Sequence, residues 1–232
     1  MRTPAALLAL LTVVACAPLG GARPPRETAS VPTLYDTQRQ IAEYIDSGRY
    51  EADVARVVDG AIVWLEERAD QVTRPAIVLD IDETSLSNWR GYRLNGWARI
   101  LNGPCDLERG PCGIRAWQAM HLATAIVPTR RLVARARELG VAVFFITGRP
   151  AEFQDETEAN LREQGYTWDG LFLLPQNFGH MTSAADFKAP ARRRLVEQGY
   201  AILLTIGDQE SDLAGGFAER GFKLPNPVYF LP

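Results

Sequence analysis

The spacing of apolar residues divides the chain into two kinds of segment. From Leu34 to Gln71, apolar residues recur every three or four positions, which is the period of an amphipathic helix. Ser47-Gly48 interrupts that pattern, so we expect two helices. Farther along, four short and continuous apolar runs lie at 76–80, 141–147, 171–174 and 201–207, and the first of them ends on an acid, Asp80. Runs of this kind are typical of strands buried on both faces of a parallel sheet.

Helical stretches separate the four apolar runs. We expect them over residues 128–139, 151–164, 189–198 and 210–220. Strands that alternate with helices predict an α/β fold with a doubly wound, Rossmann-like parallel sheet. Such sheets bind ligands at the carboxyl ends of their strands. The polar residues that directly follow each apolar run are therefore the candidate functional residues.

An insertion of about residues 85–127 does not fit the alternation of strand and helix, and we expect it to form a small cap over the strand ends. It contains the aromatic residues Trp89, Tyr92, Trp97 and Trp117. The three tryptophans and Tyr229 either stack on a flat leaving group or serve as structural core. Cys105 and Cys112 also lie in the insertion, around the turn signal Gly110-Pro111. A disulfide between them and a pair of free thiols are both open.

Length and charge limit the classes of protein that fit. The chain has 232 residues, of which 47% are apolar, and a formal net charge of −3. This suits one domain with a small cap and gives no indication of a nucleic-acid-binding surface. A zinc site is disfavoured because the chain has two histidines, and the same scarcity argues against a haem-binding lipoprotein. The sequence does not indicate an oligomeric state.

The N-terminus has its own composition. Residues 1–15 hold one charge, Arg2, and an apolar run of signal-peptide length, too short to span a bilayer. Ala15-Cys16 at the end of this run resembles a bacterial lipobox, which would place a lipid anchor on Cys16. We expect residues 16–32, rich in Pro, Gly and Ala, to be a flexible tether, and residues 33–232 to form the globular domain. The protein would then be exported and lipid-anchored at the outer membrane or its periplasmic face.

Two candidate groups carry carboxylates. Asp80 and Asp82 follow the first apolar run, and Asp208 and Asp212 follow the fourth. Carboxylates this close need a compensating cation, and a hard divalent ion bound by oxygens is the natural one. Taken alone, each pair is also common as a helix cap followed by an exposed acid.

Two further groups suit an anion. Thr147-Gly148-Arg149 follows the second run and offers a hydroxyl, a bare backbone and a guanidinium to a phosphate oxygen. Lys188 stands at the start of a predicted helix, where it would neutralise charge on a phosphoryl group; Lys223 is a weaker competitor for this role. The ends of the successive strands thus present two acids, a threonine, a lysine and two further acids, in that order along the chain. Residues that merely cap helices by chance would not be expected to follow this order.

These motifs together resemble the haloacid-dehalogenase (HAD) superfamily. Asp80-Ile-Asp-Glu-Thr84 and the tail 222–230 resemble its acid phosphatase subfamily IIIB, which includes class C bacterial lipoprotein acid phosphatases and plant vegetative storage proteins. The resemblance covers about residues 34–232. It implies the HAD fold and a Mg²⁺-dependent acid phosphatase that acts on small phosphomonoesters, including nucleoside monophosphates.

The resemblance also implies a role for each motif residue. Asp80 would be the nucleophile that forms an aspartyl-phosphate, and Asp82 the general acid and base. Thr147, the Gly148 N–H and Lys188 would hold the phosphoryl oxygens. Mg²⁺ would be bound by Asp80, the backbone carbonyl of Asp82 and Asp208, with Asp212 either a direct ligand or the group that orients a metal-bound water.

Two other functions stay open at this stage. The same residues would serve a phosphotransferase, which passes the phosphoryl group from Asp80 to an alcohol instead of water. A non-catalytic storage or binding protein on the same fold is the other alternative, although it predicts loss of the nucleophile and Asp80 is present.

Overall fold

The computed structural model of the chain describes residues 31–179 and 183–231, and the part from Leu34 onward forms one compact unit. The expected signal peptide at residues 1–15 lies outside the described residues, as does the expected tether up to residue 30. Within the described ranges, no helix combines the length and the apolar character needed to cross a membrane.

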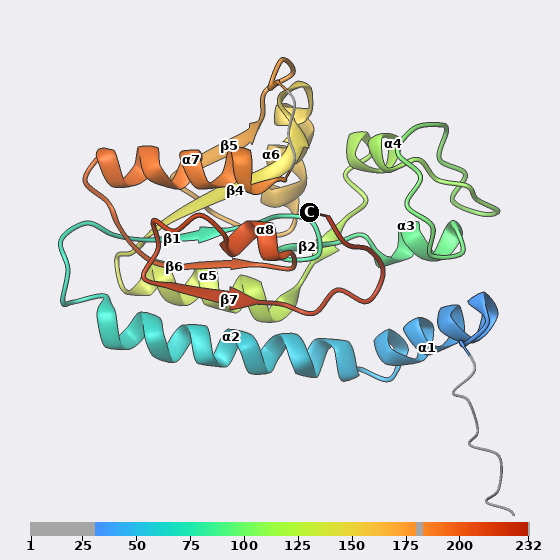
Figure 1. Cartoon of the computed structure of the whole chain (residues 1–232), viewed down its shortest axis with the longest axis horizontal. Coiled ribbons are helices and arrows are strands. Elements are labelled where there is room, and N and C mark those ends of the chain that lie inside the picture. The colour runs from blue at the N-terminus through green and yellow to red at the C-terminus, as the bar shows by residue number, and fades with distance from the viewer. Residues whose placement is uncertain (1–30, 180–182, 232) are drawn as a thin grey trace, which may run out of the picture. The chain divides into compact units, whose positions relative to one another are not determined.

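The core of the compact unit is a five-stranded sheet, and all of its neighbouring strands pair in parallel (Figure 1). In spatial order the strands are β5 (Gly170–Leu174), β4 (Ala142–Pro150), β1 (Pro75–Leu79), β6 (Ala201–Gly207) and β7 (Arg220–Lys223). Strand β1 is central: its Leu79 pairs with Phe145 of β4 and with Ile206 of β6. The four predicted strands are all present, and β7 is an edge strand that the apolar pattern did not predict.

Helices cover both faces of the sheet, which confirms the doubly wound architecture. Ile77 and Leu79 of β1 belong to the cluster that includes α2 (Arg49–Arg68) and α5 (Val127–Glu138), whereas Ala76 and Val78 pack with α7 (Ala185–Glu197). Figure 1 shows α7 on one side of the sheet and α2 with α5 on the other. This alternation follows from the two-residue period of side chains along a strand.

The two N-terminal helices are separated where the sequence predicted. Helix α1 (Leu34–Asp46) ends before Gly48, whose φ of 78° lies in the left-handed region that glycine adopts at little cost. Directly after β4 in the chain, a short 3₁₀ turn (Ala151–Phe153) precedes α6 (Gln154–Glu163).

The expected helix over 210–220 is wrong. Helix α8 covers only Glu210–Leu213, and β7 begins at Arg220. Gly215 and Gly216 have φ of 86° and 76°, so the backbone turns there and cannot continue the helix. The buried guanidinium of Arg192 donates hydrogen bonds to backbone carbonyls in the turn, those of Asp212, Ala214 and Gly216.

The insertion between β1 and α5 has secondary structure of its own. It contains β2 (Leu86–Ser87), α3 (Trp89–Leu94), α4 (Ile114–Ala119) and β3 (Thr124–Ala125), with β2 and β3 paired antiparallel. Figure 1 shows α3 and α4 beyond the carboxyl ends of the sheet strands. The insertion is therefore placed as a cap would be, beside the edge where the candidate residues lie.

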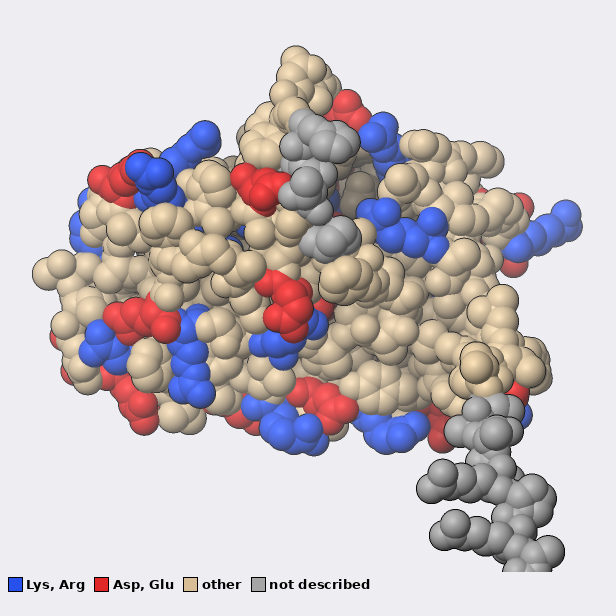
Figure 2. All heavy atoms as spheres, in the orientation of Figure 1, with Lys and Arg blue, Asp and Glu red and all other residues tan. Residues whose placement is uncertain are grey.

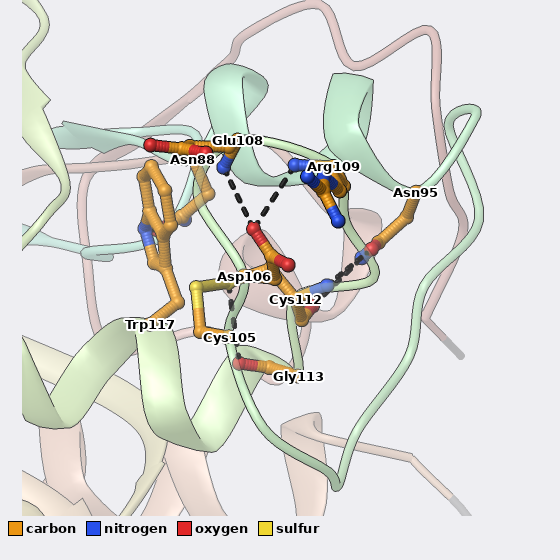
Figure 3. Close-up of a disulfide and its surroundings, with 9 residues drawn as sticks. All are labelled: Asn88, Asn95, Cys105, Asp106, Glu108, Arg109, Cys112, Gly113 and Trp117. Carbon is orange, nitrogen blue, oxygen red and sulfur yellow. Dashed lines mark hydrogen bonds between the residues drawn. A yellow bond between two sulfur atoms is a disulfide. The ribbon is translucent and has the colours of Figure 1, made fainter.

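Cys105 and Cys112 form a disulfide in the insertion (Figure 3), which settles the alternative that the sequence left open. The side chain of Asn95 binds the backbone of Cys112 twice: its Oδ1 accepts the N–H at 2.7 Å and its Nδ2 donates to the carbonyl at 2.8 Å. Asp106 Oδ1 accepts the N–H groups of Glu108 and Arg109. The two hydrogen bonds of Asn95 therefore hold the disulfide loop against the C-terminal end of α3.

Candidate functional site

Three carboxylates meet at the carboxyl ends of β1 and β6. Asp80 directly follows β1, Asp208 directly follows β6, and Asp212 lies in α8. All three are buried, and each offers an oxygen that lies within 4.8 Å of the others. Oxygen donors in such a cluster are the ligands that a hard divalent cation prefers.

Lys188, in the first turn of α7, reaches into this cluster. Its Nζ lies 2.5 Å from Oδ1 of Asp80 and 2.5 Å from Oδ1 of Asp212. Burial raises the pKa of Asp80 well above its usual range, and the charge of Lys188 only partly opposes this. Burial would lower the pKa of Lys188, but the charges of Asp212 and Asp80 outweigh it and raise that pKa. The competitor Lys223 instead donates to the backbone carbonyls of Asp208 and Leu224.

The charges in the cluster do not balance. When all three carboxylates are ionised, they face one ammonium among the described residues, which leaves two negative charges. Burial, followed by the charge of Asp212, raises the pKa of Asp208 to about 6. A single divalent cation supplies the missing charge, so the donor set fits such an ion in both chemistry and charge.

Asp208 and Asp212 are held by neighbours that fix their directions. Asn226 Nδ2 donates to Oδ2 of Asp208 at 2.7 Å. Oδ2 of Asp212 accepts the N–H of Gln209 at 2.8 Å and so caps α8. Gly207 leaves room for Asp212, because a Cβ at this position would overlap the aspartate side chain. The sequence predicted both acids but neither of the two groups that orient them, the side chain of Asn226 and the N–H of Gln209.

Asp82 lies at the same edge but faces a different partner. The guanidinium of Arg149 donates from Nη2 to Oδ1 at 2.7 Å and from Nε to Oδ2 at 3.1 Å. Asn88 Nδ2 donates to Oδ1 at 2.9 Å. Burial alone would raise the pKa of Asp82, but the charge of Arg149 and these hydrogen bonds outweigh it and lower the pKa.

Arg149 therefore has a different neighbour from the one that the sequence suggested. Its side chain is fully buried and paired with Asp82, whereas we expected a phosphate oxygen. Its Nη1 is buried without a hydrogen-bond partner among the described residues. Sequence reasoning missed the pair because the two residues are far apart in the chain.

Thr147 and Gly148 stand at the end of β4, as expected. Thr147 is buried, and its Oγ1 accepts the N–H of Arg149 at 3.1 Å. No atom of the described residues lies within 4 Å of the place where a Cβ on Gly148 would stand. A ligand can therefore approach the backbone at Gly148 more closely than it could approach any residue with a side chain.

The C-terminal tail closes one side of the site, through a contact that sequence reasoning missed. The hydroxyl of Tyr229 donates to Oε2 of Glu83 at 2.5 Å, and the N–H of Asn88 donates to Oε1 at 2.7 Å. Glu83 is fully buried, with a left-handed φ of 56°. Burial, followed by the charges of Asp82 and Asp208, raises the pKa of Glu83 well above its usual range. The sequence feature that pointed to this part of the chain was the resemblance of the tail, residues 222–230, to the subfamily named above.

A cavity of about 300 Å³ opens over these residues. Its floor includes Asp80, Asp82, Gly148, Lys188, Asp208 and Asp212, and its outer wall includes residues of the insertion and the tail, among them Tyr92, Arg99, Ile114, Arg115, Gln118 and Tyr229. Of the residues expected to stack, Tyr229 lines the cavity, whereas Trp89, Trp97 and Trp117 are not among its described lining residues. Tyr92, which was not expected to stack, lines it as well. Trp89 and Trp117 are buried, and Trp117 Nε1 donates to Asn88 Oδ1 at 3.0 Å, which is a structural role.

The outer surface carries both signs of charge. On the face drawn in Figure 2, basic and acidic side chains of the described residues are interspersed and form no broad basic stretch. Attraction of an anion on this face would therefore depend on the local groups of the cavity.

Comparison with known proteins agrees with this geometry. The family model described as HAD superfamily, subfamily IIIB (Acid phosphatase), matches residues 25–232. The stem 28 kDa glycoprotein of Glycine max is 34% identical over 193 residues, which cover 82% of this chain and 72% of the relative. Acid phosphatase 1 of Solanum lycopersicum is 30% identical over 198 residues, which cover 82% and 73%.

Among solved structures, the class C acid phosphatase from Bacillus anthracis has the same fold. It superimposes with a TM-score of 0.66 over 84% of this chain and 86% of that one, at 23% sequence identity. A second structure of that enzyme contains bound tungstate.

Proposed function

Because the chain belongs to the HAD superfamily, subfamily IIIB (acid phosphatase), we propose that it hydrolyses small phosphomonoesters in the cavity above the strand ends. One observation carries the proposal: Asp80 lies at the cavity floor, 2.5 Å from Lys188 and within the cluster completed by Asp208 and Asp212. This places a nucleophile, a neutralising cation and a candidate metal site around one point.

In the first step, a carboxylate oxygen of Asp80 attacks phosphorus. The new O–P bond forms as the ester P–O bond breaks, and the leaving alcohol takes a proton from Asp82. In the second step, water attacks the aspartyl-phosphate, Asp82 accepts the proton of that water, and Asp80 is regenerated with release of phosphate. Arg149 and Asn88 fix the direction of Asp82 for both steps. Because they also lower its pKa, the resting carboxyl is ionised and takes up a proton before it serves as the acid of the first step.

Lys188, Thr147 and the Gly148 N–H would hold the transferred group. Lys188 places its charge where negative charge collects on the phosphoryl oxygens, and the open backbone at Gly148 gives one oxygen a close approach. Positioning and charge neutralisation of this kind supply most of the catalysis in phosphoryl transfer.

We assign Mg²⁺ as the divalent ion, held by Asp80, Asp208, Asp212 and the backbone carbonyl of Asp82. When bound, it neutralises charge on the phosphoryl oxygens and lowers the pKa of the carboxylates around it. The negative charge of the ionised cluster and the raised pKa of both Asp80 and Asp208 support a cation at this place, and the all-oxygen donor set supports a hard one such as Mg²⁺.

The substrates that we propose include nucleoside monophosphates. Tyr92 and Tyr229 line the cavity above the acids and lie 5.4 Å apart, centroid to centroid. A flat base can pack on such rings. Transfer to an alcohol instead of water remains an alternative for the second step.

The test uses the chain from Ala17 onward. We expect it to hydrolyse p-nitrophenyl phosphate with Mg²⁺ between acid and neutral pH, and to stop in a chelator. Asp80→Asn would lower kcat by at least about 10³-fold, whereas Asp155→Asn, an exposed acid on α6, would not. An absence of turnover in the metal-loaded wild type would contradict the proposal and favour a storage or binding protein.

The same assay separates hydrolysis from phosphotransfer. With an added alcohol such as glycerol, equal release of p-nitrophenol and inorganic phosphate indicates hydrolysis. An excess of p-nitrophenol over phosphate indicates that the alcohol takes the phosphoryl group, since each turnover releases one p-nitrophenol in either case.

We further propose that the protein is exported and anchored by a lipid on Cys16, at the outer membrane or its periplasmic face. The apolar run before Cys16 supports this, as does the Cys105–Cys112 disulfide, because such bonds persist in oxidising compartments. The wild type should fractionate with membranes and Cys16→Ser should not. Recovery of both in the soluble fraction would contradict the anchor.

A further inference from the structure

The outer wall of the cavity carries positive charge that the proposed chemistry does not use. Arg99 and Arg115, both from the insertion, line the same cavity as Asp80 and Lys188. Gln118 lines it as well, three residues after Arg115 in α4, which puts the two side chains on one side of that helix.

Backbone hydrogen bonds bring the two arginine segments together. The N–H of Ile114 donates to the carbonyl of Ile100 at 2.8 Å, and the N–H of Arg115 donates to the carbonyl of Leu101 at 3.2 Å. The loop that carries Arg99 therefore runs beside the start of α4. Leu101 and Ile114 add apolar surface to this part of the wall.

The charge of Arg99 is not neutralised by a carboxylate of the described chain. Its guanidinium carbon lies 5.8 Å from the centroid of the Tyr229 ring, and no ion pair joins it to a described acid. Arg115 Nη1 lies 3.4 Å from Oε1 of Glu152, without a hydrogen bond between them, and Glu152 also accepts a hydrogen bond from Gln176. The wall thus has at least one uncompensated positive charge.

Gln118 adds an unused polar group. The residue is 6% exposed and lines the cavity, and its side-chain amide makes no hydrogen bond within residues 31–179 and 183–231. The amide therefore borders the cavity with its hydrogen-bonding groups free. Water or a ligand in the cavity would supply a partner.

We propose that Arg99, Arg115 and Gln118 form a subsite for a second anionic group on the leaving group of the substrate. The inference rests on the proposed phosphatase function and adds a preference within its substrate class, for phosphomonoesters that also carry a carboxylate or another phosphate. The guanidinium fork matches both of these groups, and the amide N–H of Gln118 adds a donor. Leu101 and Ile114 contact the carbon skeleton between the two ends.

Binding is measured on the Mg²⁺-loaded Asp80→Asn variant, so that substrates are not consumed. One pair of ligands, p-nitrophenyl phosphate and 4-carboxyphenyl phosphate, differs by a carboxylate in place of a nitro group. A second pair, adenosine 5′-monophosphate and adenosine 3′,5′-bisphosphate, differs by a phosphate. Isothermal titration calorimetry gives Kd for each, before and after Arg99→Gln with Arg115→Gln.

We expect the double replacement to raise Kd for the more anionic member of a pair about tenfold more than Kd for its partner. An effect in the first pair alone identifies a carboxylate, and an effect in the second pair alone identifies a phosphate. Arg109→Gln, which removes the same charge elsewhere in the insertion, should leave both ratios unchanged. Gln118→Leu should shift the ratios in the same direction by a smaller factor.

Equal changes in Kd for both members of each pair would overturn the subsite. So would an equal effect of Arg109→Gln, since that would show a general effect of net charge. Turnover by the wild type, measured separately with p-nitrophenyl phosphate, reports on the phosphatase proposal, so the two failures can be told apart.

Discussion

The floor and the outer wall of the cavity are built in opposite ways. On the floor, the residues of the acid cluster and Lys188 are at most 7% exposed, and each is tied to another member of the site. On the wall, Leu101 is 48% exposed, and the side chains of Arg99 and Arg115 also reach solvent. The floor is constrained from all sides, whereas the part of the wall that carries Arg99 and Arg115 is constrained mainly through its backbone.

This difference separates two tasks. Phosphoryl transfer needs groups held in one geometry, because a small displacement of the reacting atoms lowers the rate steeply. Selection of a leaving group tolerates side chains that adapt, because it depends on charge and contact area. Replacements on the floor should therefore act on kcat, and replacements on the wall should act on binding.

The largest effect is expected for Lys188→Met. It leaves the three carboxylates without their cation and removes a charge from the phosphoryl site, so kcat should fall by at least about 10³-fold. Steady-state kinetics with p-nitrophenyl phosphate measure this. Lys223→Met, which removes a lysine that donates to backbone carbonyls only, should cost less than Lys188→Met. Equal losses in the two variants would contradict the assignment.

Next comes Gly207→Ala. The added methyl group overlaps Asp212 and forces it out of the cluster, so we expect kcat to fall about 10²-fold with a higher Mg²⁺ requirement. Titration of activity with Mg²⁺ checks both. The matched change Gly179→Ala adds a methyl group where no atom of the described part of the chain lies within 4 Å. It should behave as the wild type, and normal activity of Gly207→Ala would show that Asp212 is not needed in its present place.

Arg149→Lys tests the partner of Asp82. Lysine keeps the charge but cannot contact both carboxylate oxygens as the guanidinium does. We expect Arg149→Lys to lower kcat about tenfold with a smaller change in KM, and Arg149→Gln to lower kcat further. Arg137→Lys, in an exposed pair with Asp169, is the control. A rise in KM without a loss in kcat would place Arg149 on the substrate instead of on Asp82.

Loss of the disulfide should act on the wall. Cys105→Ser with Cys112→Ser loosens the loop that ends at α4, so KM for an aromatic phosphomonoester should rise about threefold to tenfold while kcat stays near that of the wild type. A reductant should have the same effect on the wild type and none on the double variant. A loss in kcat alone would show that the loop supports the floor.

The smallest effect is expected for Asp46→Asn, at the exposed ion pair between α1 and α3. Arg93 donates two hydrogen bonds to Asp46 and lowers the pKa of this carboxyl. The contribution is therefore present above the ordinary carboxyl range and disappears as the pH falls through the lowered pKa. At neutral pH the Tm should drop by less than about 2 °C, and at pH 3 the difference should shrink. A larger drop would show that this pair fastens the insertion.

The sequence predicted the elements whose pattern is local. The runs around Ile77, Val143, Leu173 and Leu204 became β1, β4, β5 and β6, because continuous apolar stretches need burial on both faces. Strand β7 was missed because it is short, lies at the edge and has one buried residue, Phe222. The helix expected beyond Leu213 was wrong because apolar spacing does not register a turn at two glycines.

The residues of the candidate site also divide into those with a local signal in the sequence and those without one. Asp80, Asp208, Asp212 and Lys188 could be predicted because each stands at a fixed place after a strand or at a helix start. Their partners could not, because the contacts between Arg149 and Asp82 and between Tyr229 and Glu83 join segments far apart in the chain. Such contacts depend on the packing of the insertion and tail, which no periodic pattern encodes.

The central claim is that Asp80 becomes phosphorylated during turnover. The most direct test is rapid acid quench of the Mg²⁺-loaded enzyme during hydrolysis of p-nitrophenyl phosphate, followed by intact-protein mass spectrometry and peptide mapping. Our account predicts a population that is heavier by one phosphoryl group located on the peptide that contains Asp80, and its absence in Asp80→Asn. A phosphoryl group on a different residue, or turnover that persists in Asp80→Asn, would contradict the account.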